Sequence, residues 1–141
     1  MKKTLLILIA AIITFSSCKK DDKKCNTDTA SIAGSYKITS AKYKATSASP
    51  EADGISLLFS DACERDDVAT FNASGVYTIA DAGTQCDPVG GDSGTWSVNG
   101  STLNLDGQVF TIASFDCTNL VASTDGLFAV GDKMTITFTR Q

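Results

Sequence analysis

The sequence contains no histidine and few basic residues. Without histidine the chain lacks the commonest general base and metal ligand, so no Ser-His-Asp or Cys-His arrangement can form. The segment from Ala30 onward carries 13 acidic and 6 basic residues, and a domain this acidic will not attract nucleic acid. No glycine-rich phosphate loop precedes a helical pattern. The sequence therefore predicts a protein that is not an enzyme, binds no nucleic acid and needs no cofactor or metal.

The chain also lacks an apolar run long enough to span a bilayer. Residues 5–15 form an apolar run of 11 residues after the basic pair Lys2-Lys3, whereas a transmembrane helix needs about 20. Two serines then precede Cys18, which makes a small-residue cleavage site that ends in cysteine. This N-terminus resembles those of bacterial lipoprotein precursors, although Phe15 stands where their motif usually carries leucine. The resemblance implies that Cys18 is lipidated and becomes the mature N-terminus.

These features divide the chain into three parts. Residues 1–17 are predicted to be a lipoprotein signal peptide, and residues 18–29 the lipidated cysteine and a flexible tether, because the run 19–24 has no apolar residue. Residues 30–141 are predicted to form one domain of roughly 110 residues, enough for a single hydrophobic core. The resemblance to lipoproteins implies a lipid anchor in the bacterial outer membrane, facing either the periplasm or the outside. The membrane is thus one expected partner, while no protein partner is indicated.

From Gly34 onward, apolar and polar residues alternate between turns rich in glycine, asparagine and aspartate, which is typical of antiparallel strands. Residues 55–59 are compatible with either a short helix or an extra strand. In the first hairpin, Phe71 is expected opposite Val76. Because closing the sheet removes both edges, the predicted fold is all-β, an eight-stranded up-and-down antiparallel barrel. The expected strands cover 35–45, 68–72, 76–80, 95–98, 102–105, 108–115, 118–123 and a last strand through 134–139.

Several motifs lie along this predicted barrel, namely Gly34-Ser35-Tyr36, 63–67, 70–77, Gly94-Thr95-Trp96 and 135–140. Together they resemble the lipocalin-like domain of lipoproteins from Gram-negative bacteria. The resemblance implies a barrel related to the lipocalins, with an interior ligand site. In lipocalins an arginine near the end of the last strand packs across the ring of a tryptophan in the first strand. Here Tyr36 replaces that tryptophan and Arg140 stands in the arginine position, so the two are expected to close the barrel as a cation and ring pair.

The cysteines can be assigned to the two ends of such a barrel. If Cys18 carries lipid, four cysteines remain, and they allow three pairings. Alternating strand direction places Cys25 and Cys117 at the end where the N-terminus enters. The same alternation places Cys63 and Cys86 at the opposite end. The predicted disulfides are therefore Cys25–Cys117 and Cys63–Cys86.

Acidic residues also separate between the two ends. From Asp28 onward, Asp28 and Asp116 fall at the tethered end, and the twelve other acidic residues fall at the end that faces away from the membrane. An acidic mouth is expected to prefer neutral or cationic ligands over anionic ones, although carboxylates also gather in loops to keep a domain soluble. Four of them, at 61, 64, 66 and 67, lack the spacing of a defined calcium loop. The outward-facing group is Glu51, Asp53, Asp61, Glu64, Asp66, Asp67, Asp81, Asp87, Asp92, Asp106, Asp125 and Asp132.

Two functions remain open from the sequence. The first is a membrane-anchored envelope lipoprotein whose barrel binds a small hydrophobic or amphipathic ligand. The alternative is a filled barrel that acts as a protein or glycan interaction module at the cell surface through its acidic loop end. The inner face of each strand is apolar in both, so residue types do not separate them. The candidates to line a cavity or fill the core are Trp96, Phe71, Tyr77, Phe110, Phe115 and Phe138.

Overall fold

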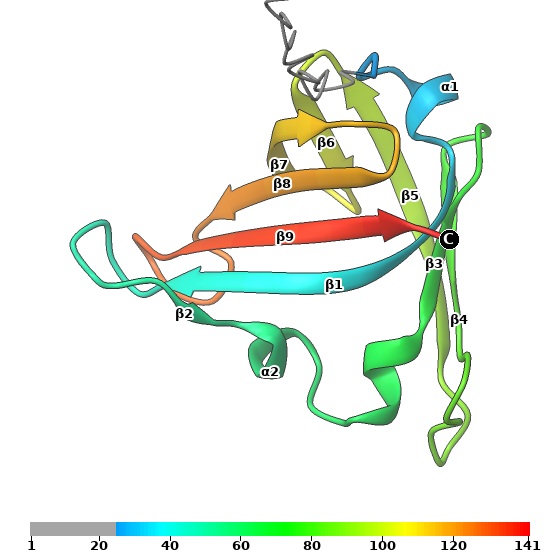
Figure 1. The fold of residues 1–141 in the computed structure, drawn as a ribbon, viewed down its shortest axis with the longest axis horizontal. Coiled ribbons are helices and arrows are strands. Elements are labelled where there is room, and N and C mark those ends of the chain that lie inside the picture. Colours follow the sequence, from blue (N-terminus) through cyan, green and yellow to red (C-terminus); the bar gives the residue numbers. More distant parts are fainter. Residues whose placement is uncertain (1–24) are drawn as a thin grey trace, which may run out of the picture.

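A computed structural model describes residues 25–141 and shows one antiparallel sheet closed into a barrel (Figure 1). The predicted signal peptide and the predicted lipidated cysteine, Cys18, lie outside the described residues. Within 25–141, no helix has the length and apolar character needed to cross a membrane. The elements are α1 (Thr29–Ile32), β1 (Gly34–Lys44), β2 (Ala52–Asp53), α2 (Ile55–Leu58), the 3-10 helix η1 (Cys63–Asp66), β3 (Val68–Phe71), β4 (Val76–Ala80), β5 (Gly91–Asn99), β6 (Thr102–Leu105), β7 (Gln108–Phe115), β8 (Asn119–Asp125) and β9 (Lys133–Arg140).

Eight strands, β1 and β3 to β9, form the barrel that the sequence predicted. From β3 to β9 each strand pairs antiparallel with the next. The first strand then pairs with the last, from Tyr36 opposite Arg140 to Lys44 opposite Lys133, and this pairing closes the sheet. The two-residue strand β2 adds to the end of β1. The all-β, eight-stranded antiparallel barrel is therefore confirmed.

The barrel is closed at one end and splayed at the other. Strand β1 pairs with β3 only over Gly34–Tyr36, although it pairs with β9 almost along its whole length. Strand β5 also changes partner, since residues 91–95 pair with β4 and residues 96–99 pair with β6. The two open seams, one between β1 and β3 and the other between β5 and β6, both widen toward the end of the barrel away from α1. In Figure 1, β3, β4 and the start of β5 accordingly turn away from β1, β8 and β9, and α2 lies on the open side.

The first hairpin differs from its predicted register by one residue. Phe71 pairs with Tyr77 and not with Val76. Gly75 adopts a positive φ of 86° and extends the loop to three residues, the arrangement in which a left-handed glycine forms a bulge after a turn. The Asn72 N–H donates to the Val76 carbonyl at 2.8 Å across this loop. The predicted register was wrong because pairing Phe71 with Val76 leaves only Ala73 and Ser74 in the turn.

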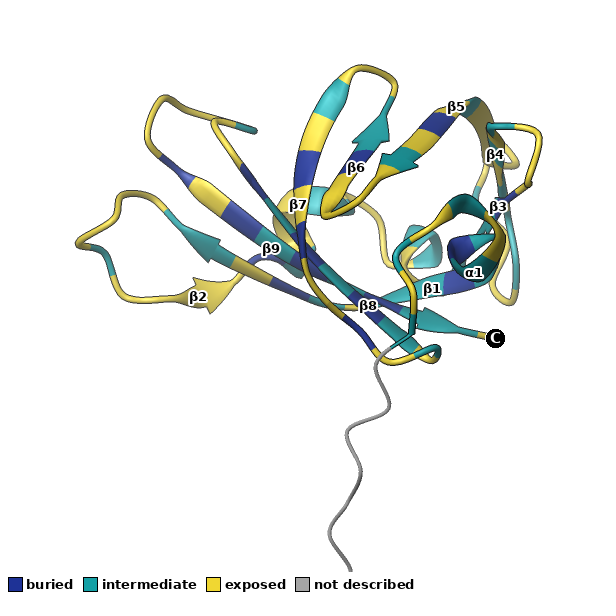
Figure 2. Cartoon of the chain, turned by 90° about the horizontal axis from the view of Figure 1, so that it is seen from above, coloured by how far each residue is buried: buried dark blue, intermediate teal, exposed yellow. Residues whose placement is uncertain are grey.

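Several aromatic side chains of the hydrophobic core cluster around Phe71. The ring of Phe71 lies 5.2 to 6.2 Å, centroid to centroid, from those of Tyr36, Tyr77, Trp96 and Phe138. The indole of Trp96 is buried and donates to the Asn72 carbonyl at 2.8 Å. Figure 2 shows buried and exposed residues alternating along the strands, which is how a barrel wall separates its core from solvent.

The first described residues are held at the closed end. Cys25 is bonded to Cys117, and its N–H donates to the Phe115 carbonyl at 3.0 Å. Asp28 caps α1 by accepting the Ser31 N–H at 2.8 Å. Residues 25–29, which the sequence assigned to the tether, are therefore held against the barrel.

Arg140 joins α1, β1 and β9 at this end. Its guanidinium carbon lies 5.2 Å from the Tyr36 ring centre and 5.6 Å from that of Phe115. The Nη2 group donates to the Ser31 carbonyl at 2.5 Å and to the Tyr36 hydroxyl at 2.6 Å. That hydroxyl donates in turn to the Ile32 carbonyl at 2.7 Å. The structure thus places Tyr36 and Arg140 together at the closing seam.

Candidate ligand pocket at the splayed end

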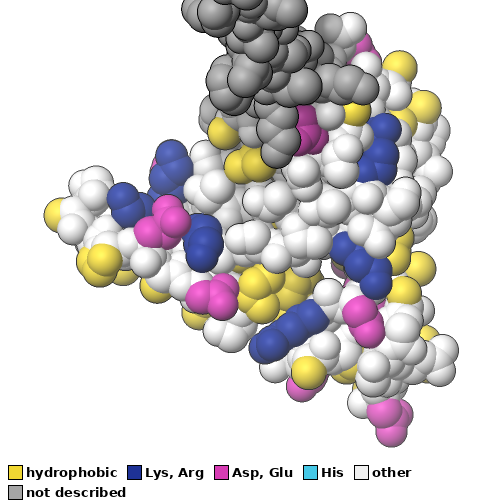
Figure 3. Space-filling model, viewed as in Figure 1, with side chains coloured by type: hydrophobic (Ala, Val, Ile, Leu, Met, Phe, Trp, Pro, Cys, Tyr) yellow, Lys and Arg dark blue, Asp and Glu magenta, His cyan; other side chains and the backbone are white. Residues whose placement is uncertain are grey.

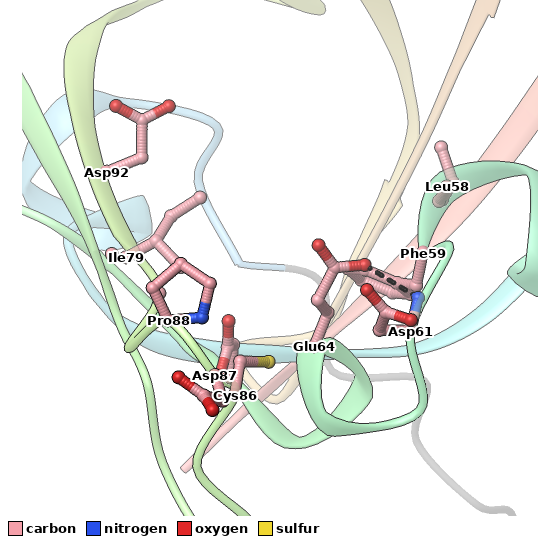
Figure 4. Close-up of a pocket in the computed structure, with 12 residues that line it drawn as sticks. Leu58, Phe59, Asp61, Glu64, Ile79, Cys86, Asp87, Pro88 and Asp92 are labelled. Carbon is pink, nitrogen blue, oxygen red and sulfur yellow. Dashed lines mark hydrogen bonds between the residues drawn. The ribbon is translucent and has the colours of Figure 1, made fainter.

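A pocket of about 550 Å³ lies at the splayed end between two walls. One wall follows α2 and η1, and the other consists of β4, the β4–β5 loop and the start of β5. Figure 4 shows the two walls facing each other. The volume is within the range of about 300–1,000 Å³ that is usual for small-molecule sites. The lining residues are Leu58, Phe59, Asp61, Glu64, Asp67, Ile79, Cys86, Asp87, Pro88, Gly90, Gly91 and Asp92.

A disulfide joins the two walls. Cys63 in η1 is bonded to Cys86 in the β4–β5 loop. The same loop is fixed by Asp81, whose Oδ2 accepts the N–H groups of Cys86 at 3.1 Å and Gly90 at 2.8 Å. From the opposite wall, Asp66 in η1 accepts the N–H of Thr84 in this loop, with a distance of 2.9 Å. Both predicted disulfides are present, and the one at this end sets the spacing of the pocket walls.

The pocket lining is acidic on a partly apolar background. Five carboxylates contribute to it, and no lysine or arginine is among the lining residues. On the whole face seen in Figure 3, by contrast, acidic and basic side chains are mixed. Leu58, Phe59, Ile79 and Pro88 supply the apolar part of the walls. The pocket therefore offers negative charge and apolar contact within one cavity.

Asp67 has a perturbed pKa in this setting. Burial raises the pKa of its carboxyl. The Ala82 N–H, which donates to Oδ1 at 3.3 Å, lowers it. The nearby carboxylates of Asp81, Asp66 and Glu64 raise it further, and the net shift is upward from 3.8. Burial and, to a smaller extent, the neighbouring negative charges therefore disfavour the ionised form of Asp67.

The substitution Asp67→Asn is expected to stabilise the protein near pH 7. Because the folded-state pKa lies above the ordinary value of 3.8, ionising Asp67 costs stability, and the cost disappears once both states are protonated. Asparagine keeps the acceptor for Ala82 and removes the charge. We expect the Tm to rise by about 1–4 °C near pH 7, with no gain near pH 3. Calorimetry at both pH values checks this, and an equal gain at both would show that charge is not the cause.

The twelve acidic residues predicted at this end do not act as one group. Asp132 is almost fully buried and accepts the N–H groups of Leu127, Phe128 and Ala129 at 2.8 to 3.0 Å. Burial alone would raise the pKa of Asp132, but these bonds outweigh it and lower the pKa. Asp132 therefore organises the β8–β9 connection. Only five of the twelve line the pocket.

Within residues 25–141, no group of three or more aspartate, glutamate, cysteine or histidine side chains is arranged to hold a metal ion.

The comparison with protein families agrees with this architecture. The profile of the lipocalin-like domain matches residues 32–137, from the end of α1 into β9. The chain belongs to the lipocalin-like domain family. Domains of this family typically bind ligands and are not enzymes. No curated protein and no solved structure matches the chain.

In this lipocalin-like barrel, none of the six predicted aromatic candidates lines the pocket. Five of them, Trp96, Phe71, Phe110, Phe115 and Phe138, are buried in the core, and Tyr77 is half-buried against Phe71. The apolar wall residues were missed. Their one signal was the apolar stretch 55–59, which forms α2 and leads into the pocket wall.

Tyr77 instead bridges the second open seam of the lipocalin-like barrel. Its hydroxyl donates to Asp106 in the β6–β7 turn, and the same carboxylate accepts the Thr95 N–H at 2.7 Å. Gly94 leaves the room that Asp106 needs, because a Cβ there would overlap the carboxylate. The hydrogen bond to Asp106, with burial and the charges of Asp106 and Asp92, raises the pKa of Tyr77 to about 12.

The substitution Asp106→Asn is expected to return the pKa of Tyr77 toward its ordinary value of 10.0. The variant removes the negative charge beside the hydroxyl, so tyrosinate forms more readily. Carbon NMR titration of ring-labelled tyrosine follows Tyr77 separately from Tyr36 and Tyr43. The exposed Asp125→Asn variant serves as a control that should leave Tyr77 unchanged. An unchanged Tyr77 in the Asp106 variant would contradict the assignment.

Proposed function

We propose that this chain is a cell-envelope lipoprotein, anchored in the outer membrane by a lipid on Cys18, whose barrel holds a small hydrophobic or amphipathic ligand. The observation that carries the proposal is the pocket of about 550 Å³ at the splayed end, with apolar wall residues on both sides. The membership in the lipocalin-like family supports ligand binding in general. No catalytic step is assigned to any residue.

The position of the anchor supports an outward-facing pocket. Cys25, seven residues after Cys18 in the sequence, is fastened to the closed end by its bond to Cys117. The pocket opens at the opposite end of the barrel. A lipid on Cys18 would therefore leave the pocket accessible from the aqueous side of the membrane.

Ligand binding in the pocket can be tested by filling it. Ile79 points into the pocket from β4, while Val76 on the same strand is 42% exposed and does not line it. We expect the domain 25–141 to bind the neutral probe N-phenylnaphthylamine saturably. The Ile79→Trp variant should bind it about tenfold more weakly or worse, and the matched Val76→Trp variant should bind it normally. Equal binding by all three proteins would place the probe elsewhere.

The anchor is tested separately. We expect the full-length chain to fractionate with membranes and to require detergent for release. The Cys18→Ser variant should not be lipidated, and mass spectrometry of its N-terminal peptide should show no acyl mass. An acyl mass on another residue would overturn the assignment of Cys18.

A second candidate function is supported by the loops of the splayed end. Three large apolar side chains are exposed there: Val89 is 68% exposed, Phe128 50% and Val130 103%. The closed half of the barrel is filled by the cluster around Phe71. An interaction module would use these loop tips and not the pocket, so the Ile79→Trp variant would leave its partner binding intact.

A further inference from the structure

We infer that the ligand of this pocket is an organic cation with an apolar body, such as an alkylamine, an arylalkylamine or a quaternary ammonium compound. The inference rests on the proposed function, since it names the chemical class that the same pocket takes. It is carried by the combination of the cavity, the placement of its carboxylates and the apolar side chains between them.

The negative charges come from both walls of the cavity. Asp61, Glu64 and Asp67 belong to the wall that includes η1, and Asp87 and Asp92 belong to the wall formed by the β4–β5 loop and β5. The labelled carboxylates of Glu64 and Asp61 lie across the pocket from Asp92 in Figure 4. With no basic residue in the lining, these charges produce a negative potential throughout the cavity. An anionic ligand such as a fatty acid would be repelled.

The pocket carboxylates also keep acceptor capacity for a ligand. Glu64 uses Oε2 to accept the Asp61 N–H at 3.1 Å, Asp67 uses Oδ1 for Ala82, and Asp92 uses Oδ1 for the Ser93 N–H at 2.7 Å. Within the described residues, the hydrogen bonds of these three side chains involve one oxygen each. A carboxylate accepts more than one donor. An ammonium group in the pocket could therefore be bound without breaking the bonds that hold the walls.

The spacing of the carboxylates favours a bulky cation over a metal ion. A metal requires several ligand atoms at roughly 2–2.6 Å from one point, and no such group is present among residues 25–141. Leu58 and Phe59 on one wall and Ile79 and Pro88 on the other are part of the same lining. These side chains would contact the apolar body of an amphipathic amine while carboxylates surround its charge.

Three ligands that share one body and differ in their charge test the inference. Full-length protein in phosphatidylcholine nanodiscs is titrated calorimetrically with phenylbutylamine, phenylbutanol and phenylbutyrate, with protein-free nanodiscs as the blank. We expect the amine to bind about tenfold more tightly than the alcohol and the carboxylate more weakly than the alcohol. Added salt should weaken the binding of the amine and leave the binding of the alcohol unchanged, because salt screens only the charge contribution.

Paired variants locate the charge effect. In Glu64→Gln with Asp67→Asn, which removes two of the five lining charges, the preference for the amine over the alcohol should fall by about threefold or more, while the affinity for the alcohol stays as in the unmodified protein and shows that the pocket is intact. The control, Glu51→Gln with Asp125→Asn, removes the same charge from exposed positions outside the lining. The control should keep the full preference for the amine. An equal loss of preference in both variants would show a general surface effect and overturn the inference.

The remaining outcomes separate this inference from the proposed function. If the alcohol or the carboxylate binds as tightly as the amine, the preference for a cation is refuted and the ligand pocket stands. If none of the three ligands binds while N-phenylnaphthylamine does bind in an Ile79-dependent way, the cationic class is again refuted. If no probe binds at all, the proposed pocket fails together with the inference.

Discussion

Replacing Cys25 and Cys117 together by serine is expected to lower the free energy of unfolding by about 4.6 kcal/mol in the chain-entropy description of disulfides. The bond joins residues 92 positions apart, so its loss greatly enlarges the unfolded ensemble. The Cys63–Cys86 bond spans only 23 positions, and its removal should cost about 3.4 kcal/mol. Urea unfolding of the two double variants measures both values.

The order of the two disulfide variants should be reversed when ligand affinity is measured in place of stability. The Cys25–Cys117 bond lies at the closed end, away from the pocket, whereas the Cys63–Cys86 bond connects the pocket walls. The less destabilised variant, without Cys63 and Cys86, should therefore lose affinity for N-phenylnaphthylamine. The more destabilised variant should retain it under conditions where it is folded. Loss of binding in parallel with loss of stability would contradict this separation of the two ends.

The substitution Arg140→Met is expected to destabilise the barrel by about 3 kcal/mol, which corresponds to a fall in Tm of about 10–15 °C. The guanidinium contacts the rings of Tyr36 and Phe115 and donates to the Ser31 carbonyl and the Tyr36 hydroxyl. Methionine can replace the packing of the stem but provides neither the charge for the rings nor the donors. Thermal unfolding followed by circular dichroism gives the shift.

Two controls identify the cause of that loss. Arg140→Lys keeps the charge but cannot donate in the planar pattern of a guanidinium, so its Tm should lie between those of the unmodified protein and the methionine variant. Arg65→Met replaces an exposed arginine in η1 and should shift the Tm by only a degree or two, since exposed substitutions have small effects. A fall in Tm of about 10–15 °C for Arg65→Met, or no fall for Arg140→Met, would show that the stability of the closing seam does not depend on the contacts of Arg140.

The barrel could be predicted because its determinants are local. Apolar and polar residues alternate along several strands, as in β9, where Met134, Ile136 and Phe138 are buried. Because neighbouring strands alternate in direction, each cysteine could then be assigned to one end of the barrel, and no distances were needed. The hairpin register failed by one residue because it depended on how Gly75 extends the turn.

The pocket could not be predicted because it arises from changes of strand partner. Strand β1 leaves β3 after Tyr36, and β5 exchanges β4 for β6 at Trp96. No local pattern specifies where such an exchange occurs. Sequence reasoning therefore looked for the site among the aromatic residues, which pack in the core. It also grouped Asp106 and Asp132 with the pocket acids, although both hold backbone segments in place.

The most direct test of the central claim is native mass spectrometry, with lipid extraction, of the full-length protein purified from its own envelope fraction. The account predicts a co-purifying small molecule that carries an amine or quaternary ammonium group. It also predicts that this molecule is absent from the Ile79→Trp variant and present in the Val76→Trp variant. A ligand-free protein, or a bound molecule that Ile79→Trp does not displace, would contradict the assignment of the pocket as the binding site.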